Sequence, residues 1–253
     1  MPQDSQTTHG HIWAYAGAFE SNTFFVFGNT QKQNQRNFKA LSYRPGGTGW
    51  STESGIENYV RNEVGQGPYY SCGNAVGHNG KIYLLGWDSS TPEIIIYDVD
   101  SKQMSLGPSD PKGPRKSFAM GIFDGAIFIA GGSTYVGGNP SNQFISSVYR
   151  LEVGGDEWQP MAPMPGTTTN PNAAHGGYYG AAEASAEVEG KWWVRFREDP
   201  TMSPRIPEHA GKVWVYNGSS WQRGGNYPGK AGEHVSEDYG TSGEWNCVQF
   251  ATM

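Results

Sequence analysis

The densest group of titratable side chains lies near the carboxy terminus of this 253-residue chain, where Glu233, His234, Glu237 and Asp238 follow one another closely. Two carboxylates beside a histidine can perform general acid–base chemistry if the fold holds them around a scissile bond. The same composition is typical of an acidic, solvated loop, and the zinc-helix pattern His-Glu-x-x-His is absent. We therefore assign no catalytic residue and keep Glu237 and Asp238 as candidate ligand-binding groups. If the protein were an enzyme, Glu233, Glu237 and Asp238 would be the first candidates for catalysis.

Aromatic residues outside the expected strands form a second set of candidates, because sugar sites use flat rings flanked by polar groups. Trp87 follows Gly86 and precedes Asp-Ser-Ser-Thr, and Tyr135 lies in a long segment rich in Gly, Asn and Ser. His175 and Tyr178 belong to the stretch His-Gly-Gly-Tyr-Tyr, for which a packed tyrosine pair is the competing interpretation. We expect ligand contacts at Trp87, Tyr135, His175 and Tyr178.

We expect no metal site and no cofactor. His9 and His11 would face the same side of a strand, but no third ligand is marked. Cys72 and Cys247 are the only cysteines, and they lack the spacing of a zinc site or a disulfide framework. Two free, half-buried thiols are expected.

The elements that must position these candidates are β-hairpins. Asp124-Gly125 separates the apolar runs Phe118–Phe123 and Ala126–Ala130, and an Asp-Gly pair in this setting is the strongest short-range hairpin signal. After a polar loop, Val148–Val153 predicts a third strand and Glu157–Met161 a fourth. Four antiparallel strands in about fifty residues have the size of one propeller blade.

The unit Arg115–Pro165 resembles a kelch repeat. Its second strand ends in Gly131-Gly132, Tyr149 and Trp158 follow, and Met161-Ala-Pro-Met-Pro165 closes it. The resemblance implies a β-propeller, in which the strands are scaffold and the loops at the two ends of a central channel carry the function.

Weaker copies of this unit flank it on both sides. Asn79-Gly80 and Glu189-Gly190 mark the first hairpins of two copies, and Glu20-Ser-Asn22 marks that of another. Tyr97 takes the place of Tyr149, and Met104 that of Trp158. The pairs Tyr43 with Trp50 and Tyr216 with Trp221 repeat the motif.

The expected fold is therefore all-β, a kelch-like propeller forming a single domain over residues 1–253. The expected blades span about 9–64, 69–114, 115–165 and 172–228, with a partial unit at 232–253. Five blades with an incomplete last one are predicted, and four blades are the alternative.

Composition narrows the function. The 36 glycines and 16 prolines favour turn-dense β structure, and 13% aromatic residues are too many for a disordered chain. The net charge of -6 and the absence of a basic run exclude a typical nucleic-acid binder. No apolar run is long enough to span a membrane, and the amino terminus has no signal-peptide pattern. The location stays open between the cytoplasm and, for a virion or mature secreted protein, the outside.

Three functions remain. The first is a non-enzymatic recognition module that binds a protein or a glycan through long inter-strand loops, chiefly Gly132–Phe144 and Arg197–Gly211. The second is a virion or appendage component, such as a tail or fibre protein, in which a neighbouring chain of a homo-oligomer could complete the last blade. The third is a propeller enzyme with acidic residues in its channel.

Overall fold

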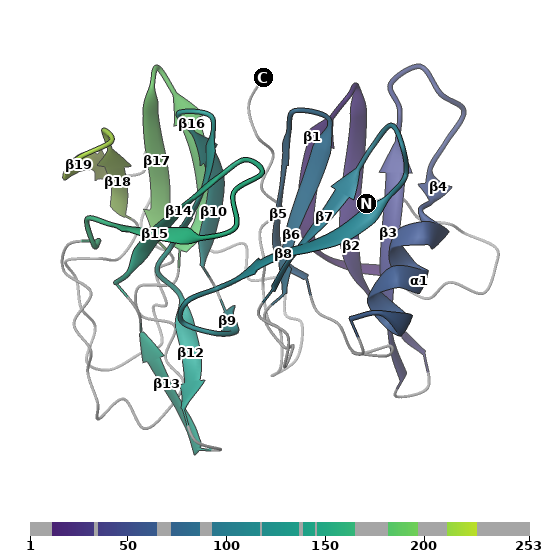
Figure 1. Cartoon of the computed structure of the whole chain (residues 1–253), viewed down its shortest axis with the longest axis horizontal. Coiled ribbons are helices and arrows are strands. Elements are labelled where there is room, and N and C mark those ends of the chain that lie inside the picture. The colour runs from purple at the N-terminus through teal and green to yellow at the C-terminus, as the bar shows by residue number, and fades with distance from the viewer. Residues whose placement is uncertain are drawn as a thin grey trace.

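The computed structural model describes residues 12–32, 35–64, 72–86, 93–116, 118–136, 139–144, 146–164, 182–196 and 212–226. Four sheets of four antiparallel strands follow one another along the chain as blades I to IV (Figure 1). Blades I and II contain β1 (Ile12–Glu20), β2 (Thr23–Lys32), β3 (Gln35–Tyr43), β4 (Ser51–Thr52), β5 (Cys72–His78), β6 (Lys81–Gly86), β7 (Glu93–Asp98) and β8 (Met104–Ser109). Blades III and IV contain β10 (Ala119–Phe123), β11 (Ala126–Ala130), β14 (Val148–Glu152), β15 (Trp158–Met161), β16 (Ala182–Val188), β17 (Lys191–Phe196), β18 (Lys212–Tyr216) and β19 (Trp221–Asn226).

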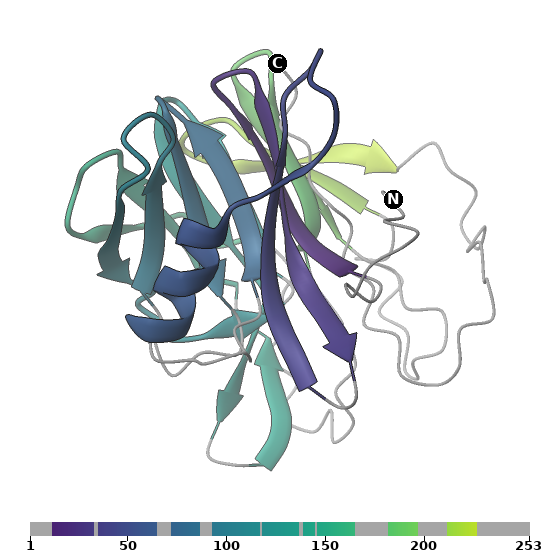
Figure 2. The ribbon, with the colours of Figure 1, turned by 90° about the vertical axis from the view of Figure 1, so that its right-hand side faces the viewer.

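The described residues thus form an all-β propeller with four blades, which is the alternative prediction and not the leading prediction of five blades. The expected partial fifth unit, 232–253, lies outside the described residues. In each blade the first strand is innermost, and β1 packs beside β5, β5 beside β10, and β10 beside β16. Figure 2 shows blade I in front, with the strands of blade IV behind it.

The inner hairpin of every blade closes with the same two-residue turn. Asn79-Gly80 and Asp124-Gly125 both have positive φ at both positions, as do Ser21-Asn22 and Glu189-Gly190. Two successive residues with positive φ define the type I′ turn, whose twist matches that of the flanking strands. The four predicted hairpins are confirmed, although only two of them use the favoured Asn-Gly or Asp-Gly pair.

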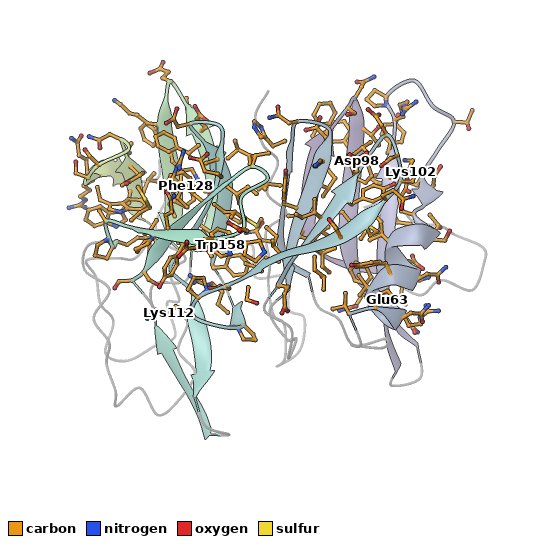
Figure 3. The ribbon with its side chains drawn as sticks, in the orientation of Figure 1. Glu63, Asp98, Lys102, Lys112, Phe128 and Trp158 are labelled. Carbon is orange, nitrogen blue, oxygen red and sulfur yellow. The ribbon has the colours of Figure 1, made fainter. Side chains whose placement is uncertain are left out.

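Each pair of successive blades buries one apolar layer between them. We call the side of a blade that points to the earlier blade its preceding face, and the other side its following face. The preceding faces consist of Ile82, Leu84 and Tyr97 in blade II, Ile127, Ile129 and Leu151 in blade III, and Trp192, Val194 and Tyr216 in blade IV. The following faces consist of Phe25, Phe27, Phe38 and Ala40 in blade I, Tyr83, Leu85 and Ile94 in blade II, and Phe128, Ala130 and Val148 in blade III. All of these side chains are buried. Phe128, one of them, is labelled in Figure 3.

Strand register corrects one repeat assignment. Tyr97 lies opposite Met104, and Tyr216 opposite Trp221, but Trp158 lies opposite Leu151. Tyr149 sits two positions earlier on its strand, opposite Pro160. Leu151, not Tyr149, is therefore the structural equivalent of Tyr97. The sequence comparison failed here because it aligned tyrosines by type, whereas the ladder of hydrogen bonds sets the position.

Repeated tryptophans join blades by hydrogen bonds. The indole Nε1 of Trp158 donates to the carbonyl oxygen of Pro108 in blade II, at 3.2 Å, and that of Trp221 donates to Ala162 at the end of blade III, at 2.9 Å. The two acceptors lie four residues after Met104 and Trp158, so they occupy equivalent positions. Trp158 therefore links blade III to blade II, and Trp221 links blade IV to blade III.

One helix, α1 (Ser54–Asn62), was not predicted from the sequence. Ile56 and Val60 are fully buried against blade I, as their spacing of four residues allows. The carboxylate of Glu57 accepts a hydrogen bond from the backbone N–H of Ala40, at 3.2 Å. It also forms an ion pair with Lys39, at 3.0 Å. The helix thereby satisfies a backbone donor of β3 where β4 is too short to reach it.

Candidate functional site

The segment expected to be a loop, Gly132–Phe144, is largely a β-hairpin. β12 (Ser133–Val136) pairs with β13 (Asn139–Phe144) on one side and with the short β9 (Arg115–Lys116) on the other. These strands form a separate sheet in the order β13-β12-β9. The hairpin β12–β13 is inserted between β11 and β14 of blade III and projects away from the four blades in both views (Figures 1 and 2).

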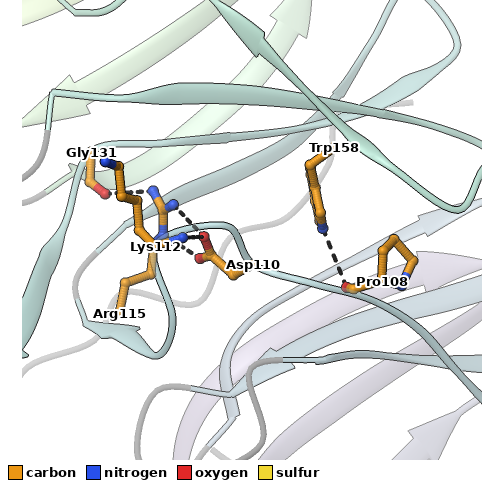
Figure 4. A network of polar contacts seen from close by, with 6 residues as sticks. All are labelled: Pro108, Asp110, Lys112, Arg115, Gly131 and Trp158. Carbon is orange, nitrogen blue, oxygen red and sulfur yellow. Dashed lines mark hydrogen bonds and ion pairs between the residues drawn. The ribbon is translucent and has the colours of Figure 1, made fainter.

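A buried arginine fixes the base of this hairpin. Arg115 has no exposed surface, and its guanidinium forms a two-pronged ion pair with Asp110, in which Nη2 lies 2.6 Å from Oδ1 and Nε contacts Oδ2. Its Nη1 donates to the carbonyl oxygen of Gly131, 3.0 Å away, directly before the hairpin (Figure 4). The guanidinium also lies 5.8 Å from the ring centre of Tyr149.

The turn between β8 and β9 holds Asp110 in place for this contact. Oδ1 of Asp110 accepts a hydrogen bond from the backbone N–H of Lys112, at 2.9 Å. The carbonyl oxygen of Asp110 accepts a hydrogen bond from the backbone N–H of Gly113, also at 2.9 Å. Gly113 has a φ of 75°, which glycine adopts at little cost. Because Asp110 is bound by both the turn and Arg115, the carboxylate and the guanidinium are both neutralised and hydrogen-bonded in the interior, as a buried ion pair requires.

The main chain of Arg115 also contacts the hairpin, because β9 pairs with β12. Arg115 lies opposite Thr134, and Lys116 lies opposite Ser133. The residue whose side chain is locked to Asp110 and Gly131 is therefore also the residue whose main chain pairs with β12. Arg115 thereby ties the base of the projecting strand pair to Gly131 and to the turn at Asp110.

The structure describes one of the six predicted site residues. Tyr135 lies on β12, between Thr134 and Val136, so its main chain belongs to the hairpin. Trp87, His175, Tyr178, Glu237 and Asp238 lie outside the described residues, as does the loop Arg197–Gly211. Their roles stay predictions. Sequence reasoning missed Arg115 and Asp110. Their pairing depends on the turn at Asp110 and on the carbonyl group of Gly131, which come together only in the folded chain.

A second polar contact joins blade II to the segment before α1. The Tyr97 hydroxyl donates to Oε2 of Glu53 at 3.2 Å, while Ser42 donates to Oε1 at 2.6 Å. Burial raises the pKa of Tyr97 well above its usual value, and the nearby charge of Glu53 and this hydrogen bond raise it further. A neutral tyrosine at this place is a structural donor across the interface between blades I and II.

In the exposed loop between β7 and β8, the pKa of a side chain is lowered. Asp98 accepts hydrogen bonds from the backbone N–H of Ser101, at 2.9 Å, and from its hydroxyl, at 2.7 Å. Because both bonds favour the charged carboxylate, the pKa of Asp98 lies below its usual value. Lys102, labelled with Asp98 in Figure 3, follows in the chain. Its Nζ lies 5.5 Å from the ring centre of Tyr97. These groups stabilise a turn and converge on no common point.

Within the described part of the chain, no three His, Cys, Asp or Glu side chains gather as they would around a metal ion. Among the same residues, no helix has both the length and the apolar character needed to cross a membrane.

Comparison with known proteins fits this geometry. Residues 114–165, which include blade III and the hairpin, match the family model of the kelch motif. A solved structure described as "Structure of YjhT" is similar to this chain, with 12% sequence identity, a TM-score of 0.52, and coverage of 87% of this chain and 68% of that chain. At this identity the likeness concerns the fold alone. None of the curated proteins that were searched matches the sequence.

The class that fold and repeats define is the β-propeller. Within that class, the resemblance to the kelch-repeat family is confirmed, and it is carried by the motif at residues 114–165.

Proposed function

We propose that this protein is a non-enzymatic recognition module that binds a protein partner through the hairpin β12–β13. The observation that carries the proposal is the separate three-stranded sheet, rooted by the buried Arg115, which extends beyond the blades. Kelch propellers commonly bind proteins, and rigid scaffolds commonly display their binding groups on the segments between strands.

The free edge of the hairpin supports recognition of an extended peptide. β13 is the outer strand of its sheet, so within the described residues its second edge has no strand beside it. An unpaired edge can accept a strand from a partner, and main-chain hydrogen bonds then supply affinity. Pro140 in β13 removes one N–H. This break in the edge limits pairing with unrelated chains and restricts the register of a partner strand.

Two features favour this segment over the channel as the binding element. The hairpin occupies the place where blade II has only residues 87–92 between β6 and β7, so closing a blade does not require it. In addition, the buried ion pair at its base costs desolvation free energy, which a mere connecting loop would not need. Because the base of the hairpin is already fixed in the free protein, less conformational entropy is lost when a partner binds.

Tyr135 is the side chain that we assign as the main contact on the hairpin. Tyrosine is enriched at the centres of binding sites, since it adds a large contact area at a small loss of side-chain entropy. Binding of a glycan would place the same residue under a sugar ring, and the two occupants are separated by the experiment below.

The test is photo-crosslinking in an extract of the source cells. A photoreactive amino acid replaces Gln143 on β13 in one variant of the full chain, and Val188, which is exposed at the inner-hairpin turn of blade IV, in the control. We expect one protein to be linked at 143 and not at 188, and to be lost when unlabelled parent chain is added in excess. Equal labelling at both positions would contradict the proposal, and a hit restricted to a glycan array, abolished by Tyr135→Ala, would show a lectin instead.

A further inference from the structure

The strand pair β2–β3 of blade I is longer than its counterparts in the other blades. β2 and β3 have 10 and 9 residues, whereas β6 and β7 have 6 each and β11 and β14 have 5 each. β1 pairs with β2 as far as Thr30, and β4 pairs with only two residues of β3. The pairing of β2 with β3 continues to Lys32 opposite Gln35. Residues 30–32 and 35–37 thus form a two-stranded extension, which we call the blade I arm.

The blade I arm and the hairpin β12–β13 extend from the same end of the propeller. The first and second strands of every blade join at one end, so the second and third strands join at the opposite end. Both extensions lie at this second connection, one in blade I and the other in blade III. They point in the same direction in both views, the arm in purple and the hairpin in teal (Figures 1 and 2). Blade II lies between them, because β1 packs beside β5 and β5 beside β10.

The two extensions differ in charge. The arm carries Lys32 and Arg36, and the surrounding stretch 21–52 contains no Asp or Glu, although the net charge of the chain is -6. Glu57 contacts this part of β3, but it is paired with Lys39, 3.0 Å away, and so does not balance the charges of the arm. The hairpin β12–β13 contains no charged residue. One extension is therefore positive and the other neutral.

We propose that the protein partner of the hairpin β12–β13 also contacts the blade I arm, and that it presents an acidic segment to Lys32 and Arg36. This inference rests on the proposed function, because it names the chemistry of the same partner. Complementary charges orient a partner and raise its association rate. The net charge of -6 opposes binding of a long polyanion such as nucleic acid, whereas a short acidic segment needs only local positive charge.

Two separate contacts on one scaffold also strengthen binding. Once the partner touches the hairpin, its contact with the arm forms within the complex, so the second contact adds affinity without a second loss of translational freedom. The arm and the hairpin share one partner in this account, and the uncharged hairpin supplies contacts that salt does not weaken.

Photo-crosslinking first tests whether both extensions touch the same protein. A photoreactive amino acid replaces Gln35 on β3 in the full chain, and the cell extract and the control at Val188 are those used for position 143. We expect the protein that is linked at 143 to be linked at 35 as well. Mass spectrometry should show that the peptide linked at 35 contains more Asp and Glu than Lys and Arg.

Charge reversal then tests the acidic segment, with the purified partner as the probe. Lys32→Glu with Arg36→Glu is compared with Lys102→Glu and Lys191→Glu, which change the net charge equally at the opposite end of the propeller (Figure 3). At about 0.1 M salt, where charges more than about 10 Å apart are largely screened, we expect the association rate constant to fall at least about ten-fold for the first pair and less than about two-fold for the control.

A third variant, Lys32→Gln with Arg36→Gln, removes the charges without reversing them and is used if the reversed pair does not keep the melting curve of the parent. Its association rate should be lower than that of the parent and should depend less on salt. Capture of no protein at 143 would contradict the proposed function itself. A partner linked at 143 but not at 35 would overturn this inference alone, as would equal rates for the two charge-reversed pairs or a link from 35 to a second copy of the chain.

Discussion

At the scale of single residues, Arg115 is the group on which the hairpin depends most. Its charge is fully buried and is balanced by Asp110, while the carbonyl oxygen of Gly131 accepts a further hydrogen bond. Removing one member of a buried pair leaves the other charge without compensation, which costs far more than losing a surface pair.

Arg115→Met should therefore lower the free energy of unfolding by about 3–5 kcal/mol, measured by urea denaturation. The control is Arg150→Met, which breaks the exposed ion pair with Glu152 and should cost no more than about 1 kcal/mol. The double variant Asp110→Leu with Arg115→Met should recover part of the loss, because no buried charge remains. Equal effects of Arg115→Met and Arg150→Met would contradict the anchoring role.

Tyr97 gives a prediction for alkaline pH. Since its pKa is raised above the ordinary 10.0 in the folded state, the folded protein holds this proton more tightly than the unfolded chain does. Its contribution to stability is complete below the unfolded pKa, and it is lost as the pH rises through the folded pKa.

Tyr97→Phe should cost about 1 kcal/mol near neutral pH, because the hydrogen bond to Glu53 is lost. Above pH 10, the stability of the variant should fall less steeply than that of the parent, as thermal unfolding at several pH values would reveal. Parallel curves for the two proteins would show that Tyr97 does not titrate with unfolding. Glu53→Gln should shift the parent curve in the same direction, since it removes the neighbouring charge.

At the scale of the elements, the inner hairpins are defined by their turns. Asn79-Gly80 and Asp124-Gly125 suit positive φ at both positions, but Glu189 adopts a φ of 52° with a side chain that disfavours it. The register of the hairpin survives because the buried Trp192 and Val194 on β17 fix which side of the strand faces the core.

Glu189→Asn should raise the free energy of unfolding by about 0.5–1 kcal/mol, since asparagine tolerates the left-handed region better. Asp124→Asn is the matched control, with an expected change within about 0.5 kcal/mol because aspartate already tolerates that region. Chemical denaturation of the two variants would measure both values. A loss of stability in Glu189→Asn would mean that the glutamate side chain has a role beyond the turn.

Sequence alone predicted most strands of the blades and all four inner turns, because alternating apolar runs and turn residues are local signals. It missed α1, although Ile56, Val60 and Val64 repeat every four residues, since that stretch was included in the expected first blade, about 9–64, in which only strands were sought. The hairpin β12–β13 was predicted as a loop because its polar sequence, Ser133–Phe144, offers no apolar alternation. Its strands are specified by pairing with Arg115 and Lys116, a contact that arises only in the folded chain.

At the scale of the whole molecule, successive blades are joined by apolar layers and by a repeated indole hydrogen bond. The tryptophan of one blade donates to the carbonyl oxygen at an equivalent place in the blade before it, as Trp158 and Trp221 do. Blade II has Met104 in this position, so the interface between blades I and II depends on packing and on the Tyr97–Glu53 contact.

Trp158→Phe should lower the free energy of unfolding by roughly 1–3 kcal/mol, because the carbonyl of Pro108 loses its donor in a partly buried setting. Trp50→Phe, at the equivalent position of blade I, should change stability by no more than about 0.5 kcal/mol, because Trp50 is exposed and has no such acceptor among the described residues. The two melting temperatures distinguish a repeated bond between blades from a general need for tryptophan. Similar losses in both variants would contradict the role of the indole bond.

Recognition by the hairpin is the central claim, and a binding titration tests it most directly. Once photo-crosslinking has identified the partner, its dissociation constant is measured for the parent, for Tyr135→Ala, and for a chain in which residues 133–144 are replaced by the six-residue connection of blade II, 87–92. We predict that the shortened chain keeps the melting curve of a folded propeller and loses binding by at least about a hundred-fold, and that Tyr135→Ala loses about ten-fold or more, as expected for a central contact residue. Unchanged affinity in the shortened chain would contradict the account.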